Sequence, residues 1–539
     1  MSIGKVLVIG LDGATFDVIK PLLKQGKLPT IAKLMDEGVY GELRSVIPPI
    51  SPTAWASFAT GMNPGKHGIF GFTSPEGGIP SINSAKIRTL PLWEILSIHN
   101  KRVCVISVPF TYPPKEINGV IVTGMGTPDE KSDFVFPKEL KKKLIKFGYK
   151  PDFDRKCLDS EELFDEEIGG LLEGVWQTSK YLIKELDWDF FMVVFMATDT
   201  VQHIFWKYLD EKHPQYEKRK ANKYGNKIYE YYQKIDKIIS KLIRMVDNNT
   251  YIIIMSDHGG GPVYKRVSLN KWLENEGLLK LKTDAKRKSF FPSVQHLLVM
   301  IGLNRENIVK ITDILGLKDF LSKIMRLIKM DKFILKFIPS RLHDFFENID
   351  WEQTVAYAKG SYGNIYLNVD KNDKQYEEIR EKIIEKIYNL VDPESGQKVV
   401  SKVFKREDLF WGPFVNSAPD IYVAPEPGYE IIGYTLGNSV FLPPFRSGTH
   451  TENGIFICKG PYIKRGHKID GLKIIDLAPT ILYIFGLPIP KDMDGRVLKE
   501  IFDEGSECAK RQIKYQESII EEKLRIKSKI EHMKKIGKI

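Results

Sequence analysis

Six side chains that could bind a metal stand at or near the ends of short apolar segments: Asp12, Asp199, His203, Asp257, His258 and His450. Carboxylate oxygens and imidazole nitrogens suit Zn²⁺, with Mn²⁺ as the second choice. The four cysteines form no CxxC pair, so a cysteine-based zinc site is not expected. The set therefore predicts a divalent-metal site built from nitrogen and oxygen ligands.

Each of these residues also has an ordinary structural explanation. Asp12 could cap a helix that starts after the following glycine. Asp199 and His203 are four residues apart, so they could simply contact each other along one face of a helix. Asp257 and His258 precede three glycines, which would let the backbone approach a bound group closely. His450 follows Ser447 in a stretch that we expect to be a loop. The presence of all six residues at or near strand ends indicates a metal site more strongly than any one of them does.

A hydroxyl nucleophile could come from residues 48–61, which begin as a turn and continue as a helix. Ser51 stands at the expected N-terminus of this helix, just before Pro52 at the first helical position. Serine is a favoured N-cap residue, which would explain Ser51 without chemistry. The free N–H groups of a helix start also bind phosphate, so a hydroxyl there could attack a phosphorus atom. Thr53 is the alternative nucleophile.

The elements that would position these side chains alternate along the chain. Apolar segments predict strands at 5–11, 103–108, 119–123, 190–195, 251–255 and 454–458. Helical patterns lie between them, for example at 168–186 and 228–246. Continuous apolar strands suit a sheet that is buried on both faces. We therefore expect an α/β fold, doubly wound, with a mostly parallel sheet and helices on both faces. Ligands of such sheets bind beyond the carboxyl ends of the strands, where the candidate residues stand.

The length of 539 residues exceeds one ordinary core. We expect a core made of 1–279 and 351–505, the second part carrying a small α+β element. Residues 280–350 would form a helical insert or cap, and 506–539 a charged C-terminal helix. The insert combines apolar and basic residues. It could pack on the core, or it could contact lipid at a membrane surface.

Composition narrows the functional classes further. Apolar residues make up 42% and charged residues 28%, which are values of a globular protein. No apolar run approaches the ~20 residues of a membrane span, and no signal peptide is expected. The net charge of +11 is concentrated in 281–340 and 506–539, so nucleic-acid binding is not expected. We expect a cytoplasmic protein, with the insert as a candidate contact with a membrane and the C-terminal helix as a candidate contact in a homo-oligomer.

Five motifs occur in order along the chain: VIGLDG (8–13), SPTAWASFATG (51–61) followed by NPGKHGI (63–69), DTVQH (199–203), SDHG (256–259) and GTH (448–450). With these motifs the chain resembles the alkaline phosphatase superfamily, and most of all its type I phosphodiesterase/nucleotide pyrophosphatase branch. The segments IDLAPTIL (475–482) and DG (494–495) are also similar to that superfamily. The resemblance spans roughly residues 5–500 apart from the insert.

The resemblance implies an alkaline phosphatase-like fold with two divalent metal ions, Zn²⁺ before Mn²⁺. The implied site has two sets of ligands: Asp199, His203 and His450 for one ion, and Asp12, Asp257 and His258, with Ser51 beside them, for the other. The implied activity is that of a phosphodiesterase or pyrophosphatase that acts on a small phosphate ester through a phosphoseryl intermediate.

Two departures from the branch keep alternatives open. The usual nucleophile of the branch is threonine, where this chain has Ser51. The branch carries an asparagine three residues later that helps to bind phosphate, and here Ala54 replaces it. A phosphomonoesterase or a phosphomutase of the same superfamily is therefore an alternative. We favour diesters because no arginine is identified that would bind a monoester dianion. The non-enzyme alternative, a catalytically silent scaffold, is disfavoured because all six ligands are present.

Overall fold

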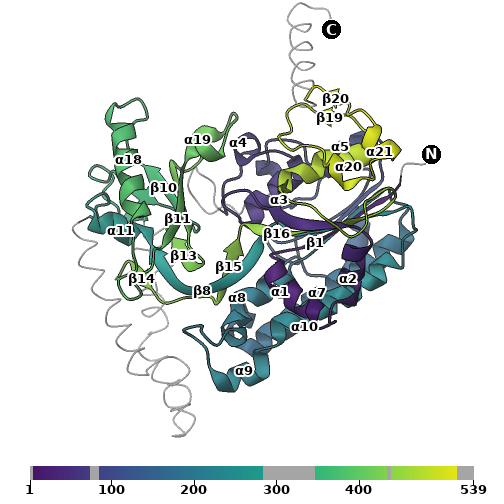
Figure 1. Cartoon of the computed structure of the whole chain (residues 1–539), viewed down its shortest axis with the longest axis horizontal. Helices are drawn as coiled ribbons and strands as arrows, with labels where there is room; N and C mark the ends of the chain where they lie inside the picture. The colour runs from purple at the N-terminus through teal and green to yellow at the C-terminus, as the bar shows by residue number, and fades with distance from the viewer. Residues whose placement is uncertain (1–3, 73–83, 283–345, 434–438, 519–539) are drawn as a thin grey trace, which may run out of the picture.

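The computed structural model describes residues 4–72, 84–282, 346–433 and 439–518 (Figure 1). Its main element is a ten-stranded sheet with the order β17-β2-β16-β7-β1-β6-β3-β4-β5, and β18 pairs with β2. The strands are β1 (Val6–Leu11), β2 (Val39–Arg44), β3 (Val103–Val108), β4 (Gly119–Thr123), β5 (Val135–Phe136), β6 (Phe190–Phe195), β7 (Tyr251–Met255), β16 (Asn453–Lys459), β17 (His467–Lys468) and β18 (Leu472–Lys473).

Strands β7, β1, β6, β3 and β4 run parallel to one another, whereas β16 is antiparallel to β7 and to β2. The sheet therefore confirms the expected α/β fold with a largely parallel sheet. Helices cover both faces (Figure 1). One face carries α1 (Phe16–Lys24), α2 (Pro29–Asp36), α7 (Glu161–Glu185), α8 (Ala197–Leu209) and α10 (Lys227–Ile243), and the other carries α3 (Ser51–Thr60), α5 (Leu92–Ile98) and α20 (Leu477–Ile484).

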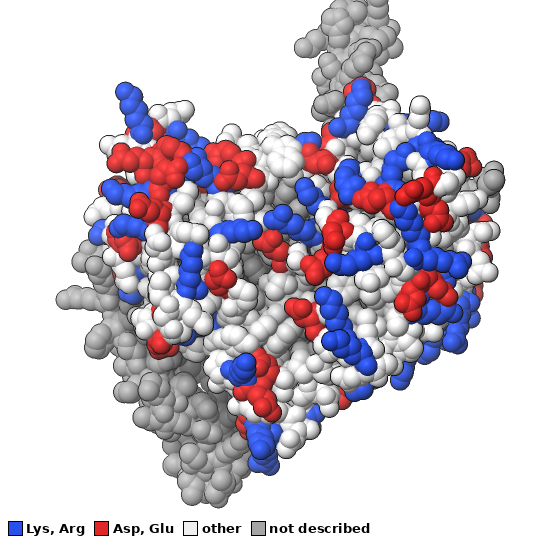
Figure 2. All heavy atoms as spheres, viewed as in Figure 1, with Lys and Arg blue, Asp and Glu red and all other residues white. Residues whose placement is uncertain are grey.

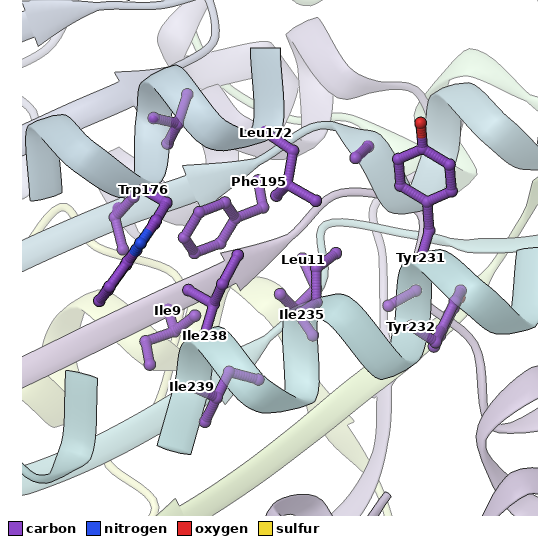
Figure 3. Close-up of a cluster of buried hydrophobic side chains, with 14 of the residues drawn as sticks. Ile9, Leu11, Leu172, Trp176, Phe195, Tyr231, Tyr232, Ile235, Ile238 and Ile239 are labelled. Carbon is purple, nitrogen blue, oxygen red and sulfur yellow. The ribbon is translucent and has the colours of Figure 1, made fainter. Parts of the chain in front are cut away.

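Strand β1 shows why the central strands are apolar throughout. Ile9 and Leu11 pack into the cluster formed with α7 and α10, which Figure 3 shows with Phe195 of β6. Val6 and Val8 belong to the cluster on the opposite face, with α3, α5 and α20. Successive side chains of a strand point to opposite faces, so a strand between two helical layers needs apolar residues at every position.

A smaller part of the molecule is built around an antiparallel sheet with the order β11-β12-β10-β9. Its elements are β9 (Ala356–Ala358), β10 (Asn364–Leu367), α18 (Gln375–Tyr388), β11 (Val400–Lys405) and β12 (Ile421–Pro425). The long strand β8 (Gly259–Ser268) curves from the core toward this part (Figure 1). It pairs with β13 (Gly428–Ile432), β14 (Phe441–Leu442) and β15 (Gly448–Thr451).

The remaining described elements are short. They are α4 (Pro64–His67), η1 (Ser84–Lys86), η2 (Lys138–Leu140), α6 (Lys141–Lys146), η3 (Arg155–Asp159), α9 (Lys218–Tyr224), α11 (Leu269–Asn275), α19 (Arg406–Leu409), η4 (Val415–Ser417), η5 (Ile474–Asp476), β19 (Ile489–Pro490), η6 (Lys499–Ile501), α21 (Glu507–Lys510) and β20 (Tyr515–Gln516).

The expected helical insert and the expected C-terminal helix are only partly described. Most of the insert at 280–350 lies outside the described residues, because residues 283–345 are not described. In the tail, residues 506–518 contain only α21 and β20, which pairs with β19, and the rest of the expected C-terminal helix is not described. Within the described ranges, no helix is both long and apolar enough to cross a membrane. Lys and Arg are interspersed with Asp and Glu on the face shown in Figure 2.

Candidate active site

One group of expected ligands converges from α8 and β15. Asp199 and His203 lie one turn apart on α8, with His203 Nε2 3.0 Å from Asp199 Oδ2. His450 of β15 places its Nε2 3.5 Å from Asp199 Oδ1 and 3.1 Å from His203 Nε2. Asp199 and His450 are buried, so the three side chains meet largely out of contact with water.

The position of His450 depends on strand pairing. Residues 448–451 form β15, antiparallel to β8, and His450 lies opposite Gly260. The expectation of a loop at 447–450 is therefore wrong for this segment, because the backbone hydrogen bonds of the three-glycine stretch hold it as a strand. His450 Nδ1 lies 3.0 Å from the Tyr362 hydroxyl and 3.1 Å from the Pro49 carbonyl oxygen. These contacts orient the ring so that Nε2 faces Asp199.

A second group converges from the ends of β1 and β7. Because these strands are parallel neighbours, Asp12 after β1 and Asp257 after β7 emerge at the same edge of the sheet. His258 Nε2 lies 3.6 Å from Asp12 Oδ1 and 3.3 Å from Asp257 Oδ2, and all three residues are fully buried. The Nδ1 of His258 lies 2.9 Å from the Gly259 carbonyl oxygen. A proton on Nδ1 would donate to that carbonyl and leave the Nε2 lone pair free for a cation.

The two groups are joined through His258. Its ring stacks on that of His450, with 3.7 Å between the ring centroids. Ligand atoms of Asp199, His258 and His450 lie within 4.8 Å of one another, and so do those of Asp12, Asp257 and His258. The structure thus brings together all six expected ligands, and it places His258 close to both groups rather than to one alone.

The electrostatics of the second group fit a cation. Burial raises the pKa of Asp12 well above its usual value, and the nearby charge of Asp257 adds to this effect. Burial also raises the pKa of Asp257, with a further contribution from Asp199. Among the described residues, Asp257 Oδ2 accepts no hydrogen bond, although His258 Nε2 is only 3.3 Å away. Two lone pairs aimed at a common point produce this geometry, and a divalent cation at that point would satisfy both.

Asp199 behaves differently from the other two carboxylates. Burial tends to raise its pKa, but the facing imidazoles of His203 and His450 outweigh burial and lower it. The pKa of His450 is lowered well below the usual value by burial and by the neighbouring His258. A neutral imidazole and an ionised carboxylate are the protonation states that bind metals, so this group also fits a cation.

Ser51 lies at the edge of the second group. Its Oγ is 3.3 Å from His258 Nε2 and 3.5 Å from Asp12 Oδ1. Helix α3 begins at Ser51, one residue earlier than expected, and Ile50 is the cap residue with no side-chain capping bond. Ser51 is therefore not an N-cap, and its hydroxyl contacts Asp12 and His258 instead of capping α3. The Thr53 hydroxyl is buried and has no hydrogen-bond partner within the described part of the chain.

The structure also tests whether Asp12 caps a helix and whether the three glycines after His258 have a packing role. Thr15 caps α1, so Asp12 does not; instead, Asp12 Oδ2 accepts a 2.7 Å hydrogen bond from Trp55 Nε1. A Cβ at Gly260 would lie 2.3 Å from Gln202 Oε1, and one at Gly259 would lie 2.2 Å from the Asn453 carbonyl oxygen, so these two glycines let neighbouring segments pack closely. Gly13 adopts a φ of 63° and donates its N–H to Asp257 Oδ1 at 3.2 Å.

His67, which lies in the family-like motif after α3, is part of the core. Its Nδ1 accepts a hydrogen bond from the Ile69 N–H at 3.2 Å, so the proton on Nε2 donates to Ser57 Oγ at 2.8 Å. Burial lowers the pKa of His67 to about 3. The side chain is fully buried and links α3 to the following turn, which agrees with a structural role.

Arg446 also lies at the site, although no motif in the sequence indicates it. Its Nη1 lies 3.4 Å from His203 Nε2, and its Nη2 donates to Glu430 Oε1 at 2.6 Å and to the Tyr362 hydroxyl at 2.8 Å. The sequence identified no arginine that would bind a monoester dianion, and the structure now places the Arg446 guanidinium beside His203. The available signal was its position four residues before His450, on the segment that leads into β15.

The site opens into a cavity of about 550 Å³. Its lining includes Ser51, Asp199, His203, His450 and Arg446. A substrate in the cavity could therefore reach the Ser51 hydroxyl and the first group of candidate ligands together.

Comparisons with known proteins place this geometry in a family. The profile of the type I phosphodiesterase/nucleotide pyrophosphatase family matches residues 6–453. A search of curated proteins returns no match.

Solved structures with a similar fold include human ectonucleotide pyrophosphatase/phosphodiesterase 5, at 13% identity and a TM-score of 0.49, covering 93% of this chain and 100% of that one. Another is phosphonoacetate hydrolase from Sinorhizobium meliloti 1021 in complex with phosphonoacetate, at 14% identity and a TM-score of 0.52, covering 88% and 95%. At these identities the second likeness shows the fold alone. The family profile spans most of the chain, so the protein belongs to the type I phosphodiesterase/nucleotide pyrophosphatase family and is a phosphohydrolase.

Proposed function

We propose that the protein is a phosphodiesterase or pyrophosphatase in which Ser51 is the nucleophile. The observation that carries this proposal is the position of the Ser51 hydroxyl, which lines the cavity and lies within 3.5 Å of His258 Nε2 and Asp12 Oδ1. Ser51 also begins the ten-residue helix α3, whose free N–H groups favour an anionic phosphate.

The chemistry divides among the residues in the following way. A divalent ion bound by Asp12, Asp257 and His258 would lower the pKa of the Ser51 hydroxyl, and a second ion bound by the Asp199 group would stabilise the leaving oxygen. Ser51 Oγ bonds to phosphorus, the bond from phosphorus to the leaving oxygen breaks, and the alcohol or phosphate departs. Water then hydrolyses the phosphoseryl ester, which releases the second product and restores the hydroxyl.

Zn²⁺ is the first candidate metal and Mn²⁺ the second. Three imidazoles and three carboxylates supply nitrogen and oxygen donors, and the described residues near the site offer no cysteine. Nitrogen-rich sets favour zinc, while carboxylate oxygens also suit manganese. Two ions are proposed because the ligands form two groups, on the two sides of His258.

The test compares bis(p-nitrophenyl) phosphate with p-nitrophenyl phosphate in the presence of Zn²⁺ or Mn²⁺. We expect faster hydrolysis of the diester. Ser51→Ala should lose nearly all activity, at least about 10³-fold, because it removes the attacking atom. The matched control is Thr53→Val, which removes an unpaired hydroxyl two residues away and should keep its activity. A dead Thr53→Val beside an active Ser51→Ala would transfer the role to Thr53.

A phosphomonoesterase is the second candidate, and Arg446 is the observation that favours it. A guanidinium 3.4 Å from His203 Nε2 could bind the extra charge of a monoester dianion. Glu430 already accepts two hydrogen bonds from this guanidinium, from Nε and from Nη2. That pairing neutralises much of its charge, so we rank the monoesterase second. A clear preference for p-nitrophenyl phosphate would reverse the ranking.

A further inference from the structure

The cavity at the site continues well beyond the residues that would hold metal. From Ser51 and Asp199 it extends along η3, α7 and α8, and its volume of about 550 Å³ is enough for a drug-sized ligand. A phosphate group alone would leave most of this space unfilled. The walls of the remainder therefore indicate what the substrate carries besides phosphate.

Those walls are largely apolar. Most of the buried and half-buried apolar residues that line them come from α7 and β6: Phe164, Ile168, Leu171, Leu172, Val175 and Phe195. Three exposed apolar side chains line the same cavity, namely Phe72 (43% exposed), Leu158 (48%) and Phe445 (82%). Large apolar side chains gathered on an accessible cavity are typical of a binding site for an apolar group.

The three lysines of the lining are each paired with a carboxylate. Lys207 and Lys220 place their Nζ atoms 3.5 and 3.4 Å from Glu161 Oε1. Lys150 lies 3.1 Å from Glu167. Because these ammonium groups already have carboxylate partners, a second phosphate or a polyphosphate chain would have to displace those partners to gain much there. The lining thus favours an uncharged apolar group over a further anionic one.

We propose that this cavity binds an apolar organic group, an alkyl chain or an apolar ring, that is esterified to the phosphate attacked by Ser51. The inference rests on the proposed phosphodiesterase function and names its substrate class. Ser51 and Asp199 face the phosphate, and the apolar ester group extends toward Leu172 and Val175 of α7. Contact with the substrate would cover the exposed side chains of Phe72 and Leu158.

The test uses p-nitrophenyl phosphodiesters whose second ester group is methyl, butyl or octyl. They are assayed with the Zn²⁺-loaded full chain below the micellar concentration. Each buried methylene can contribute up to about fourfold in affinity. We expect kcat/KM to rise by at least about tenfold from methyl to octyl, since even partial burial of the chain exceeds that factor. Equal rates across the series would overturn the inference, and so would faster cleavage of thymidine 5′-(p-nitrophenyl phosphate) than of the octyl ester.

Matched variants locate the effect in the cavity. Leu158→Gln should lower kcat/KM for the octyl ester by about three- to tenfold and leave the methyl ester unchanged. Leu163→Gln is the control, because Leu163 is 50% exposed on α7 but does not line the cavity. Equal effects of the two variants on the octyl ester would contradict the proposed location. If no diester is hydrolysed at all, the proposed function fails; hydrolysis without dependence on chain length defeats only the apolar-substrate inference.

Discussion

Asp257→Asn should change the stability of the protein in opposite directions with and without metal. In the absence of metal, Asp257 is a fully buried carboxyl, and one of its oxygens accepts no hydrogen bond from the part of the chain that the structure describes. Burial raises its pKa in the folded state, so at pH 8 the folded chain either holds an unfavourable charge or holds a proton that the unfolded chain lacks. Both cases destabilise the metal-free protein. Asparagine removes this cost and can still accept the Gly13 N–H through its carbonyl oxygen.

The size of the effect follows from a buried, unsatisfied group, which costs about 2 kcal/mol. An unfolding entropy of about 2.1 cal/mol/K per residue, over 539 residues, gives about 1.1 kcal/mol/K. The metal-free variant should therefore melt roughly 2 °C above the metal-free wild type. Metal at 1,000 times its Kd stabilises the wild type by about 4 kcal/mol, or roughly 4 °C. The variant binds the metal weakly and gains little stability from it. When metal is added, the wild type should therefore have the higher melting midpoint.

Differential scanning calorimetry at pH 8, with EDTA or with Zn²⁺, measures both midpoints. Asp236→Asn is the matched control. Asp236 is also a buried aspartate, but its two oxygens accept hydrogen bonds from the N–H groups of Ile31 and Thr30. Its substitution should lower the midpoint by a similar amount in both conditions. If Asp257→Asn behaves like this control, Asp257 has a structural role and the assignment of the second ligand group is refuted.

Three further outcomes are expected. His203→Ala should reduce bound Zn²⁺ from two ions per chain to one, measured by inductively coupled plasma mass spectrometry; retention of two ions would exclude His203 as a ligand. Arg446→Gln should lower kcat/KM for p-nitrophenyl phosphate about tenfold more than for bis(p-nitrophenyl) phosphate, because a guanidinium binds a dianion more strongly than a monoanion. Equal losses for the two substrates would show that Arg446 only orients the side chains around it. The folded-state pKa of His67 is about 3 against 6.5 in the unfolded chain, so the unfolded chain gains a proton first as pH falls. The wild type should lose about 2 kcal/mol of stability from this residue between pH 7.5 and pH 5. His67→Gln should lack that loss, and an unchanged pH dependence of the melting midpoint would contradict the buried neutral state.

The class of fold and the identity of the candidate ligands were accessible from the sequence alone. The apolar strands β1, β3, β4, β6 and β7 lie where the pattern predicts them, because strands buried on both faces leave a continuous apolar signal. Asp12 follows β1 directly, and Asp257 follows β7 after Ser256. In a parallel sheet such residues share one edge, so local sequence and a general rule were enough to bring them together.

Other parts of the site depended on contacts between distant segments. His450 reaches Asp199 because β15 pairs with β8, and the residues of 447–450 carry no strand pattern of their own. The role of Arg446 depends on Glu430 and Tyr362, which lie 16 and 84 residues away in the chain. The hydrophobic pattern of one segment does not predict which distant residue its side chains will contact.

The cavity shows most clearly which properties follow from the sequence and which depend on the tertiary structure. A helical pattern at 168–186 identifies Leu172 and Val175 as apolar positions of α7, but it does not tell whether they face the core or a ligand. That distinction arises only when η3, α7 and α8 pack around a space that also contains Ser51. The types of the candidate ligands, their spacing and their positions after the strands are local properties of the chain. The sequence alone therefore determines them. The volume left between packed elements is a property of the whole assembly, and only the tertiary structure decides it.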